Sequence, residues 1–393
     1  MKDITRRGFL KAVLGALGLT GAKAVLPAMG AAGPANSSQA DDTRTDMAST
    51  AEFFESRQHL IDLYRSRPRS MPMQAATADE FNAYAKAARA KFGELIGLDR
   101  MTPTAANPRR TGAVDRGDHV REHWLIDTEP DVAMPFYILR PKKVKGRAAA
   151  VICCHGHGPG KDAVAGLPDR PGAGNVAEGA FGVQFAKAGL LAFCPDARGF
   201  GERREADARK DPTQSSCTFL QMVGLPLGIS VIGMHAFDLV RLIDHMQARD
   251  DVRGDRIGCV GFSGGGWQSL ALGAVDDRPA CVVVSSYIHP VAAPLLFRKH
   301  NCACNMVPHL WEFFDLGDLA ALIAPRPLLI QTGDSDSLSG PNGVADVQPQ
   351  VDIARRAYQL LGCQDRIAFD VFHGGHRWDA AKALPWVGRW LTA

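Results

Sequence analysis

Ser263 lies between glycines at the junction of a strand-like and a helix-like segment. The apolar run 257–260 is typical of a buried strand, and residues 266–275 are rich in helix formers. The stretch between them, Gly261-Phe-Ser-Gly-Gly265, has the pattern G-x-S-x-G, which presents a serine hydroxyl on a sharp strand-to-helix turn. In a chain with 40 glycines this short pattern also arises by chance, so its surroundings must decide whether Ser263 is a nucleophile.

Acid and base candidates follow two later strand-like runs. A serine nucleophile needs a base that takes its proton and a carboxylate that orients the base, here in the chain order serine, acid, histidine. Asp334 and Asp336 follow one run, and His373 and His376 follow the next. Asp336 is preferred because the acid normally stands three positions after the glycine, and His376 because it lies past two glycines on a loop that can reach the serine. Asp334 and His373 stay as alternatives.

A glycine-rich turn upstream can supply the oxyanion hole. The run 149–154 ends in His155-Gly-His-Gly-Pro-Gly160, and the backbone N–H groups of His157 and Gly264 are the predicted donors. His155 and His157 can alternatively bind zinc, but no carboxylate or cysteine stands near them in the sequence. We therefore expect no metal and no cofactor.

The elements that must position these residues alternate along the chain. Strands are predicted over 119–126, 135–139, 149–154, 190–194, 257–260, 281–284, 327–331 and 367–372. Helices are predicted over 177–188, 231–246, 266–275, 351–361 and 380–391. This order indicates the α/β class, with a mostly parallel eight-stranded sheet covered by helices on both faces.

Two further regions flank or interrupt this pattern. Residues 51–117 are expected to form a helical N-terminal extension that ends in a loop over 101–116, and Thr77 is a candidate helix cap. The catalytic domain then spans 118–393, with an insert at about 201–230. Arg198, just before the insert, either belongs to a structural turn or faces a substrate carboxylate.

The N-terminus resembles an export signal. Thr5-Arg-Arg-Gly-Phe-Leu-Lys11 closely matches the twin-arginine pattern, and a mildly apolar stretch follows it. We expect a signal peptide over 1–32 and a polar disordered linker over 33–50. A membrane anchor or a cytosolic helix is the alternative, but Lys23 and Pro27 make the stretch a poor permanent span. The predicted partner is the twin-arginine export machinery, and the destination is a bacterial periplasm or the exterior.

Composition excludes some functions and leaves the cysteines open. The chain has 393 residues, 46% of them hydrophobic, which suffices for a large core. A net charge of +3 gives no basic field for nucleic acid.

Most of the nine cysteines fall in strand-like runs, where they act as small apolar residues. Cys302-Ala-Cys304 lacks the Cys-x-x-Cys spacing and is expected to be structural, with a disulfide from either cysteine to Cys217 or Cys363 left open.

The chain from about residue 118 onward resembles the alpha/beta hydrolases, and within them the dienelactone-hydrolase and acetyl xylan esterase-like branch. The matching stretches are His155-Gly-His-Gly, Asp196-Ala-Arg-Gly-Phe-Gly, Arg256-Ile-Gly-Cys-Val-Gly-Phe-Ser-Gly-Gly-Gly, Asp318-Leu-Ala-Ala-Leu-Ile-Ala-Pro-Arg-Pro-Leu-Leu, Gly333-Asp-Ser-Asp and Gly374-Gly-His-Arg-Trp. The resemblance implies Ser263 as nucleophile, His376 as base and Asp336 as acid, with the N–H groups of His157 and Gly264 as oxyanion donors.

These observations predict an exported serine hydrolase that cleaves a carboxylic ester of a carbohydrate or small molecule through an acyl-enzyme. A prolyl-oligopeptidase-like peptidase shares this core, but such enzymes usually carry a large N-terminal propeller, and roughly 70 residues precede the first predicted strand after the linker, too few for one. A non-catalytic binding protein of the same fold typically lacks the serine or the histidine, and both are present.

Overall fold

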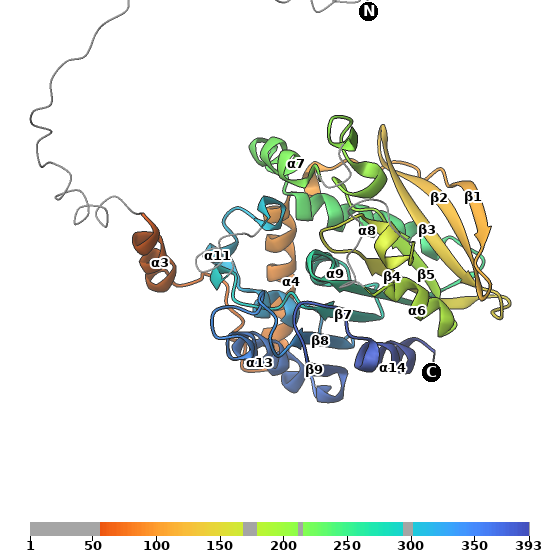
Figure 1. The fold of residues 1–393 in the computed structure, drawn as a ribbon. Helices are drawn as coiled ribbons and strands as arrows, with labels where there is room; N and C mark the ends of the chain where they lie inside the picture. The colour runs from red at the N-terminus through yellow and green to blue at the C-terminus, as the bar shows by residue number, and fades with distance from the viewer. Residues whose placement is uncertain (1–55, 168–178, 211–214, 294–301, 393) are drawn as a thin grey trace, which may run out of the picture. The chain divides into compact units, whose positions relative to one another are not determined.

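One sheet organises the protein (Figure 1). The computed structural model describes residues 56–167, 179–210, 215–293 and 302–392; the predicted signal peptide over 1–32 and linker over 33–50 lie outside them. Within the described residues the sheet has nine strands. They are β1 (Arg109–Asp115), β2 (His119–Glu129), β3 (Val132–Pro141), β4 (Ala148–Cys154), β5 (Leu191–Pro195), β6 (Val252–Phe262), β7 (Cys281–Ser285), β8 (Leu328–Gly333) and β9 (Ile367–Phe372).

The sheet is antiparallel at one edge and parallel elsewhere. Its order is β1-β2-β3-β5-β4-β6-β7-β8-β9, and every pair from β5 through β4 to β9 is parallel. The parallel strands end at one edge, where Cys154 of β4 pairs with Gly261 of β6 and Phe262 of β6 pairs with Ser285 of β7. The predicted mostly parallel sheet is confirmed, and each of the eight predicted runs matches a strand, with 190–194 and 327–331 beginning one residue before theirs.

The ninth strand, β1, was not predicted. It pairs antiparallel with β2, within the stretch 101–116 that was expected to be a loop. All seven of its side chains are exposed, so the sequence shows no alternation of apolar and polar residues that would indicate a strand. The segment 51–117 is therefore not purely helical.

Helices cover both faces of the sheet (Figure 1). Helices α6 and α14 pack on one face against residues such as Val151, Val260 and Leu329. Helices α4, α8, α9, α12 and α13 pack on the other face. The helices are α3 (Arg57–Ser66), α4 (Ala78–Ile96), α5 (Lys161–Val164), α6 (Phe181–Lys187), α7 (Cys217–Gly224), α8 (Val231–Gln247), α9 (Gly264–Val275), α11 (Leu310–Phe313), α12 (Leu316–Ala321), α13 (Val344–Leu360) and α14 (Ala380–Leu391).

Helix α4 binds directly to α9, the helix that follows Ser263. The hydroxyl of Thr77 accepts a hydrogen bond from the Glu80 N–H, which makes Thr77 the expected N-terminal cap. The guanidinium of Arg89 donates to the carbonyl oxygen of Ala274 at 2.6 Å, near the end of α9. The ring of Phe92 lies 6.0 Å from that of Trp267 on α9. Residues Ser56–Ala393 accordingly form one compact unit.

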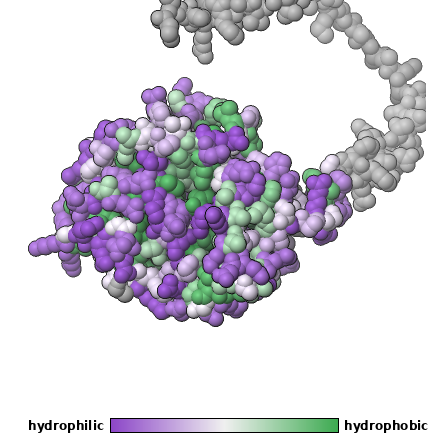
Figure 2. Space-filling view, turned by 180° about the vertical axis from the view of Figure 1, so that it is seen from behind, coloured by the Kyte–Doolittle hydropathy of each residue, from purple (hydrophilic) through white to green (hydrophobic). Residues whose placement is uncertain are grey.

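The insert at 201–230 carries an exposed apolar surface. Helix α7 and the following 3-10 turn (Leu225–Leu227) expose Phe219, Met222, Val223, Leu225 and Leu227. Figure 2 shows apolar surface in the upper part of the molecule, where α7 lies. Among the described residues no single helix meets the length and hydropathy of a membrane span, and one pair bent by 94°, Cys217–Leu227 with Val231–Gln247, meets them jointly.

Candidate active site

Ser263 lies on a strained turn between β6 and α9. Its backbone has φ 57° and ψ −124°, a region that few residues with a side chain adopt. Two of the glycines around it are required by close contacts. A Cβ on Gly261 would lie 2.0 Å from the carbonyl oxygen of Gly265, and one on Gly265 would lie 1.9 Å from the carbonyl oxygen of Cys154 in β4. The pattern G-x-S-x-G is thus explained by the packing of α9 against β4 and β6.

The structure brings Ser263, His376 and Asp336 together. The Nε2 atom of His376 lies 2.8 Å from the Oγ of Ser263. On the other side of the ring, Nδ1 lies 3.0 Å and 3.1 Å from the two carboxylate oxygens of Asp336. Each residue follows the carboxyl end of a parallel strand, β6, β9 and β8 respectively, which explains how segments more than 100 residues apart meet.

The environment of Asp336 favours its ionised form. Burial alone would raise the pKa of this carboxyl, but the hydrogen bond from His376 and the charge of that ring lower it below its usual value. The N–H of Leu338 also donates to Oδ1 at 2.8 Å. The ring of Phe262 packs 4.6 Å from that of His376 and restricts its position. The imidazole is therefore oriented from two sides.

The alternative acid and histidine form a separate pair at the surface. Nδ1 of His373 lies 2.9 Å from Oδ2 of Asp334, and the other carboxylate oxygen, Oδ1, accepts the N–H of Gly374. The side chain of His373 is 98% exposed. Neither residue is bonded to Ser263 by any contact that the structure records, so their geometry is that of a loop stabilised by a surface hydrogen bond.

The turn after β4 lies against the start of α9. The backbone nitrogen of His157 is 3.7 Å from the position that a Cβ on Gly264 would occupy, so the two predicted oxyanion donors are neighbours. His155 is buried, and its Nε2 accepts the N–H of Ala197. Burial lowers the pKa of His155, which suits this neutral, accepting role. The amide of Gln268 on α9 donates to the carbonyl oxygen of His155, which ties the turn to the helix.

The structure gives partners to two residues in this region that the sequence left without one. No cysteine stands near His157 in the sequence, yet its Nε2 lies 3.0 Å from the Sγ of Cys304. Arg198 was expected either in a structural turn or facing a substrate carboxylate, and the structure supports the structural turn. The guanidinium of Arg198 binds the buried carboxylate of Asp238 through two hydrogen bonds, at 2.8 Å and 2.9 Å, and Glu129 at 2.6 Å. It is a structural residue.

Comparison with known proteins places the chain in a family. The model of the Abhydrolase family matches residues 43–374. The chain belongs to the Abhydrolase family. It is 31% identical over 246 residues to a protein of Bacillus subtilis (strain 168) named "Putative hydrolase YtaP", covering 60% of this chain and 77% of that protein.

Solved structures share the fold of this abhydrolase. One described as "a putative acetyl xylan esterase" from Bacteroides fragilis NCTC 9343 has a TM-score of 0.68 at 20% identity, with 82% of this chain and 83% of that chain covered. A glucuronoyl esterase from Solibacter usitatus has a TM-score of 0.57 at 16% identity, with 82% and 96% covered. The predicted alpha/beta-hydrolase fold is confirmed.

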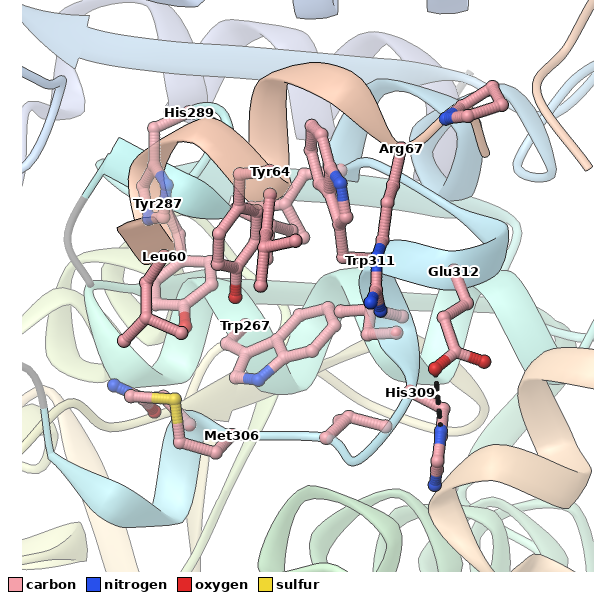
Figure 3. A pocket seen from close by; sticks show the side chains of 17 residues that line it. Leu60, Tyr64, Arg67, Trp267, Tyr287, His289, Met306, His309, Trp311 and Glu312 are labelled. Carbon is pink, nitrogen blue, oxygen red and sulfur yellow. Dashed lines mark hydrogen bonds and ion pairs between the residues drawn. The ribbon is translucent and has the colours of Figure 1, made fainter. Parts of the chain in front are cut away.

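A cavity of about 530 Å³ opens beside the site of this abhydrolase (Figure 3). Trp267, one turn after Ser263 on α9, lines it and stacks on Tyr287 at 5.5 Å between ring centroids. Tyr64 of α3 and Trp311 of α11 line it as well. The sequence did not identify Tyr64 and Trp267 as lining residues. The ring of Tyr64 lies 5.2 Å from that of Trp311, although roughly 250 residues separate the two in the chain.

The close packing of the turn around Ser263 predicts that Gly265→Ala and a glycine substitution in α14 have opposite effects on stability. Gly265→Ala places a methyl group against the carbonyl oxygen of Cys154, so we expect the free energy of unfolding to fall by about 3 kcal/mol. Gly388→Ala, in α14 with no atom within 4 Å of the new Cβ, should instead raise it by about 0.5 kcal/mol. Urea denaturation followed by circular dichroism measures both, and equal stability of the two variants would contradict the packing account.

Proposed function

We propose that this abhydrolase is a serine esterase that hydrolyses a carboxylic ester. The observation that carries the proposal is the continuous chain of hydrogen bonds from Asp336 through His376 to Ser263. A hydroxyl is a weak nucleophile at neutral pH, and a histidine at 2.8 Å can remove its proton during attack. The buried carboxylate holds the ring in the required tautomer and stabilises the imidazolium that forms.

The reaction proceeds in two halves. Ser263 attacks the ester carbonyl while His376 takes the hydroxyl proton, and the tetrahedral intermediate collapses with expulsion of the alcohol, which receives that proton from His376. Water then enters, His376 removes a proton from it, and the resulting hydroxide attacks the acyl group. Collapse of the second intermediate releases the acid and restores the Ser263 hydroxyl.

The oxyanion of both intermediates is assigned to the backbone N–H groups of His157 and Gly264. Gly264 is the first residue of α9, so its N–H points out of a helix N-terminus, where the helix dipole also favours negative charge. The neighbouring turn supplies the second donor, and the hydrogen bond from Gln268 to His155 holds it in place.

The proposed substrate is an ester of a carbohydrate or another small molecule. Structural neighbours described as acetyl xylan and glucuronoyl esterases support this class. The aromatic lining of the adjacent cavity supports it too, since flat faces such as Trp311 and Tyr64 suit the apolar faces of sugar rings. Asn305 lines both this cavity and the small hollow beside His157 and Gly264, which links the proposed binding and reaction sites.

We also propose export to the periplasm or the exterior by the twin-arginine machinery. The support is the pair Arg6-Arg7 followed by Phe9 and Leu10, a match to the recognition pattern of that route. An esterase acting on polymeric plant sugars would need such a location, because its substrate does not enter the cell.

Removal of the nucleophile should abolish the activity. The chain is expected to hydrolyse p-nitrophenyl acetate, and Ser263→Ala should lower kcat at least ~10⁴-fold, because no other group attacks the carbonyl. A spectrophotometric assay, with circular dichroism to show that the variant is folded, measures this. Unchanged hydrolysis by the folded variant would refute the assignment of Ser263 as the nucleophile.

The same assay on acetyl, feruloyl and methyl-uronate sugar esters ranks the substrates by their rates of hydrolysis.

Substitutions of the two aspartates, Asp336 and Asp334, should have different effects on kcat in the same assay. Asp336→Asn keeps the shape of the side chain but removes the charge that orients His376, so we expect kcat to fall roughly 10³- to 10⁴-fold. Asp334→Asn is the matched control, because Asp334 is two residues away and binds the exposed His373 and the N–H of Gly374, and it should retain near full activity. The reverse ranking would show that Asp334 is the acid.

A further inference from the structure

Four potential metal ligands meet behind the oxyanion turn. They are His157 in the turn after β4, Cys217 at the start of α7, and Cys302 and Cys304 around the short 3-10 helix Ala303–Asn305. The ring nitrogen and the three sulfur atoms all lie within 4.8 Å of one another. The Sγ atoms of Cys217 and Cys302 are 3.3 Å apart, and Nε2 of His157 is 3.0 Å from the Sγ of Cys304.

This donor set and spacing fit a tetrahedral zinc ion. Zinc bound at about 2.3 Å to sulfur and about 2.0 Å to nitrogen holds its ligand atoms roughly 3.5 to 3.8 Å apart, close to the separations seen among these four atoms. Three thiolates and one imidazole are a common ligand set of structural zinc sites. We propose that His157, Cys217, Cys302 and Cys304 bind one zinc ion.

Cysteine burial alone does not explain the cluster. The sulfur atoms of Cys154 and Cys259 also lie close together, at 3.8 Å, but they are in the apolar core among strands and are not part of any group of three or more potential ligands among the described residues. The group at His157 differs because four donors from three separate segments converge on one point. A Cys217–Cys302 disulfide is the competing state. This disulfide would need the two sulfur atoms, now 3.3 Å apart, to approach to about 2.0 Å. Cys304 and His157 would then not be joined to Cys217 and Cys302.

The zinc ion would join three segments around the proposed active site. His157 belongs to the turn assigned to the oxyanion, Cys217 anchors the insert, and Cys304 precedes Asn305, which lines the cavity. Because all four positions are filled by protein, no coordination site is left for substrate, so the ion stabilises the fold and positions the turn. The zinc site is proposed independently of the esterase activity. Its role in positioning the oxyanion donor rests on that proposed function.

Metal content tests the proposal directly. The purified full-length chain, produced in zinc-supplemented medium, should contain about one zinc per chain by plasma mass spectrometry. Cys302→Ser and Cys304→Ser should lose most of it. Cys363→Ser is the matched control, since Cys363 is nearly buried but lies outside the cluster, and it should keep its zinc. Cobalt substituted for zinc should show the visible bands of a tetrahedral ion and thiolate charge-transfer bands, both lost in Cys304→Ser.

A chain without zinc overturns the proposal in either of two ways. A metal-free chain in which all nine cysteines titrate as thiols after denaturation would show a thiol–imidazole cluster only. A mass lower by two hydrogen atoms, with a Cys217–Cys302 cross-linked peptide, would show the disulfide. Metal content of the unaltered chain decides the question even where a variant fails to fold. As an independent readout, a strong chelator should lower the Tm of the unaltered chain and of Cys363→Ser by about 5 °C and leave Cys304→Ser unmoved. If the chain contains zinc but a chelator does not slow the Ser263-dependent hydrolysis, the zinc site stands and only its role in positioning the oxyanion donor is refuted.

Discussion

The contact between α9 and β4 is the constraint on which the site depends. Gly265 packs so closely on the carbonyl oxygen of Cys154 that no side chain fits between them. This approach brings the first turn of α9 next to the turn that follows β4, and so places Gly264 beside His157. It also forces Ser263 into a backbone conformation at positive φ, with its hydroxyl directed to His376. The strain at one residue is maintained by packing along the whole length of α9.

The N-terminal helices extend this arrangement beyond the sheet. Helix α4 is bonded to the end of α9 through Arg89, so the helix behind Ser263 is held at both ends. Helix α3 contributes Tyr64 to the aromatic cavity, and Trp267 of α9 contributes to the same cavity from the other side (Figure 3). A segment that is an extension in sequence is thus part of the surface that we propose binds the substrate.

Much of the fold was predictable because buried parallel strands have a simple composition. Runs such as Ala149–Cys154 and Cys281–Val284 are apolar on both faces, and each is a strand. The exposed strand β1 has no such pattern and was missed. The order of Ser263, Asp336 and His376 along the chain follows from the strands that precede them, but the choice between Asp334 and Asp336 depends on which carboxylate is buried beside the ring, a tertiary contact that spacing only suggests.

The sequence anticipated only part of the cysteine cluster: it left open a bond from Cys302 or Cys304 to Cys217, which the structure places 3.3 Å from Cys302, but it gave no link to His157. The ligands of the cluster are separated by 60 and 85 residues, and the one local pair, Cys302-x-Cys304, has an unusual spacing. Cys217 of the insert and the two cysteines after β7 come close to His157 only in the folded chain. If the chain is exported already folded, as Arg6 and Arg7 predict, zinc bound in the cytoplasm would protect these thiols before they reach an oxidising compartment.

The central claim is that Ser263 is the nucleophile, and covalent trapping tests it most directly. An activated organophosphonate, which mimics the tetrahedral intermediate, should react with the native chain once per molecule, and peptide mass spectrometry should place the adduct on Ser263. His376→Ala should react far more slowly, because the hydroxyl is then no longer activated. An adduct on another residue, or no adduct on a preparation that hydrolyses esters, would contradict the account.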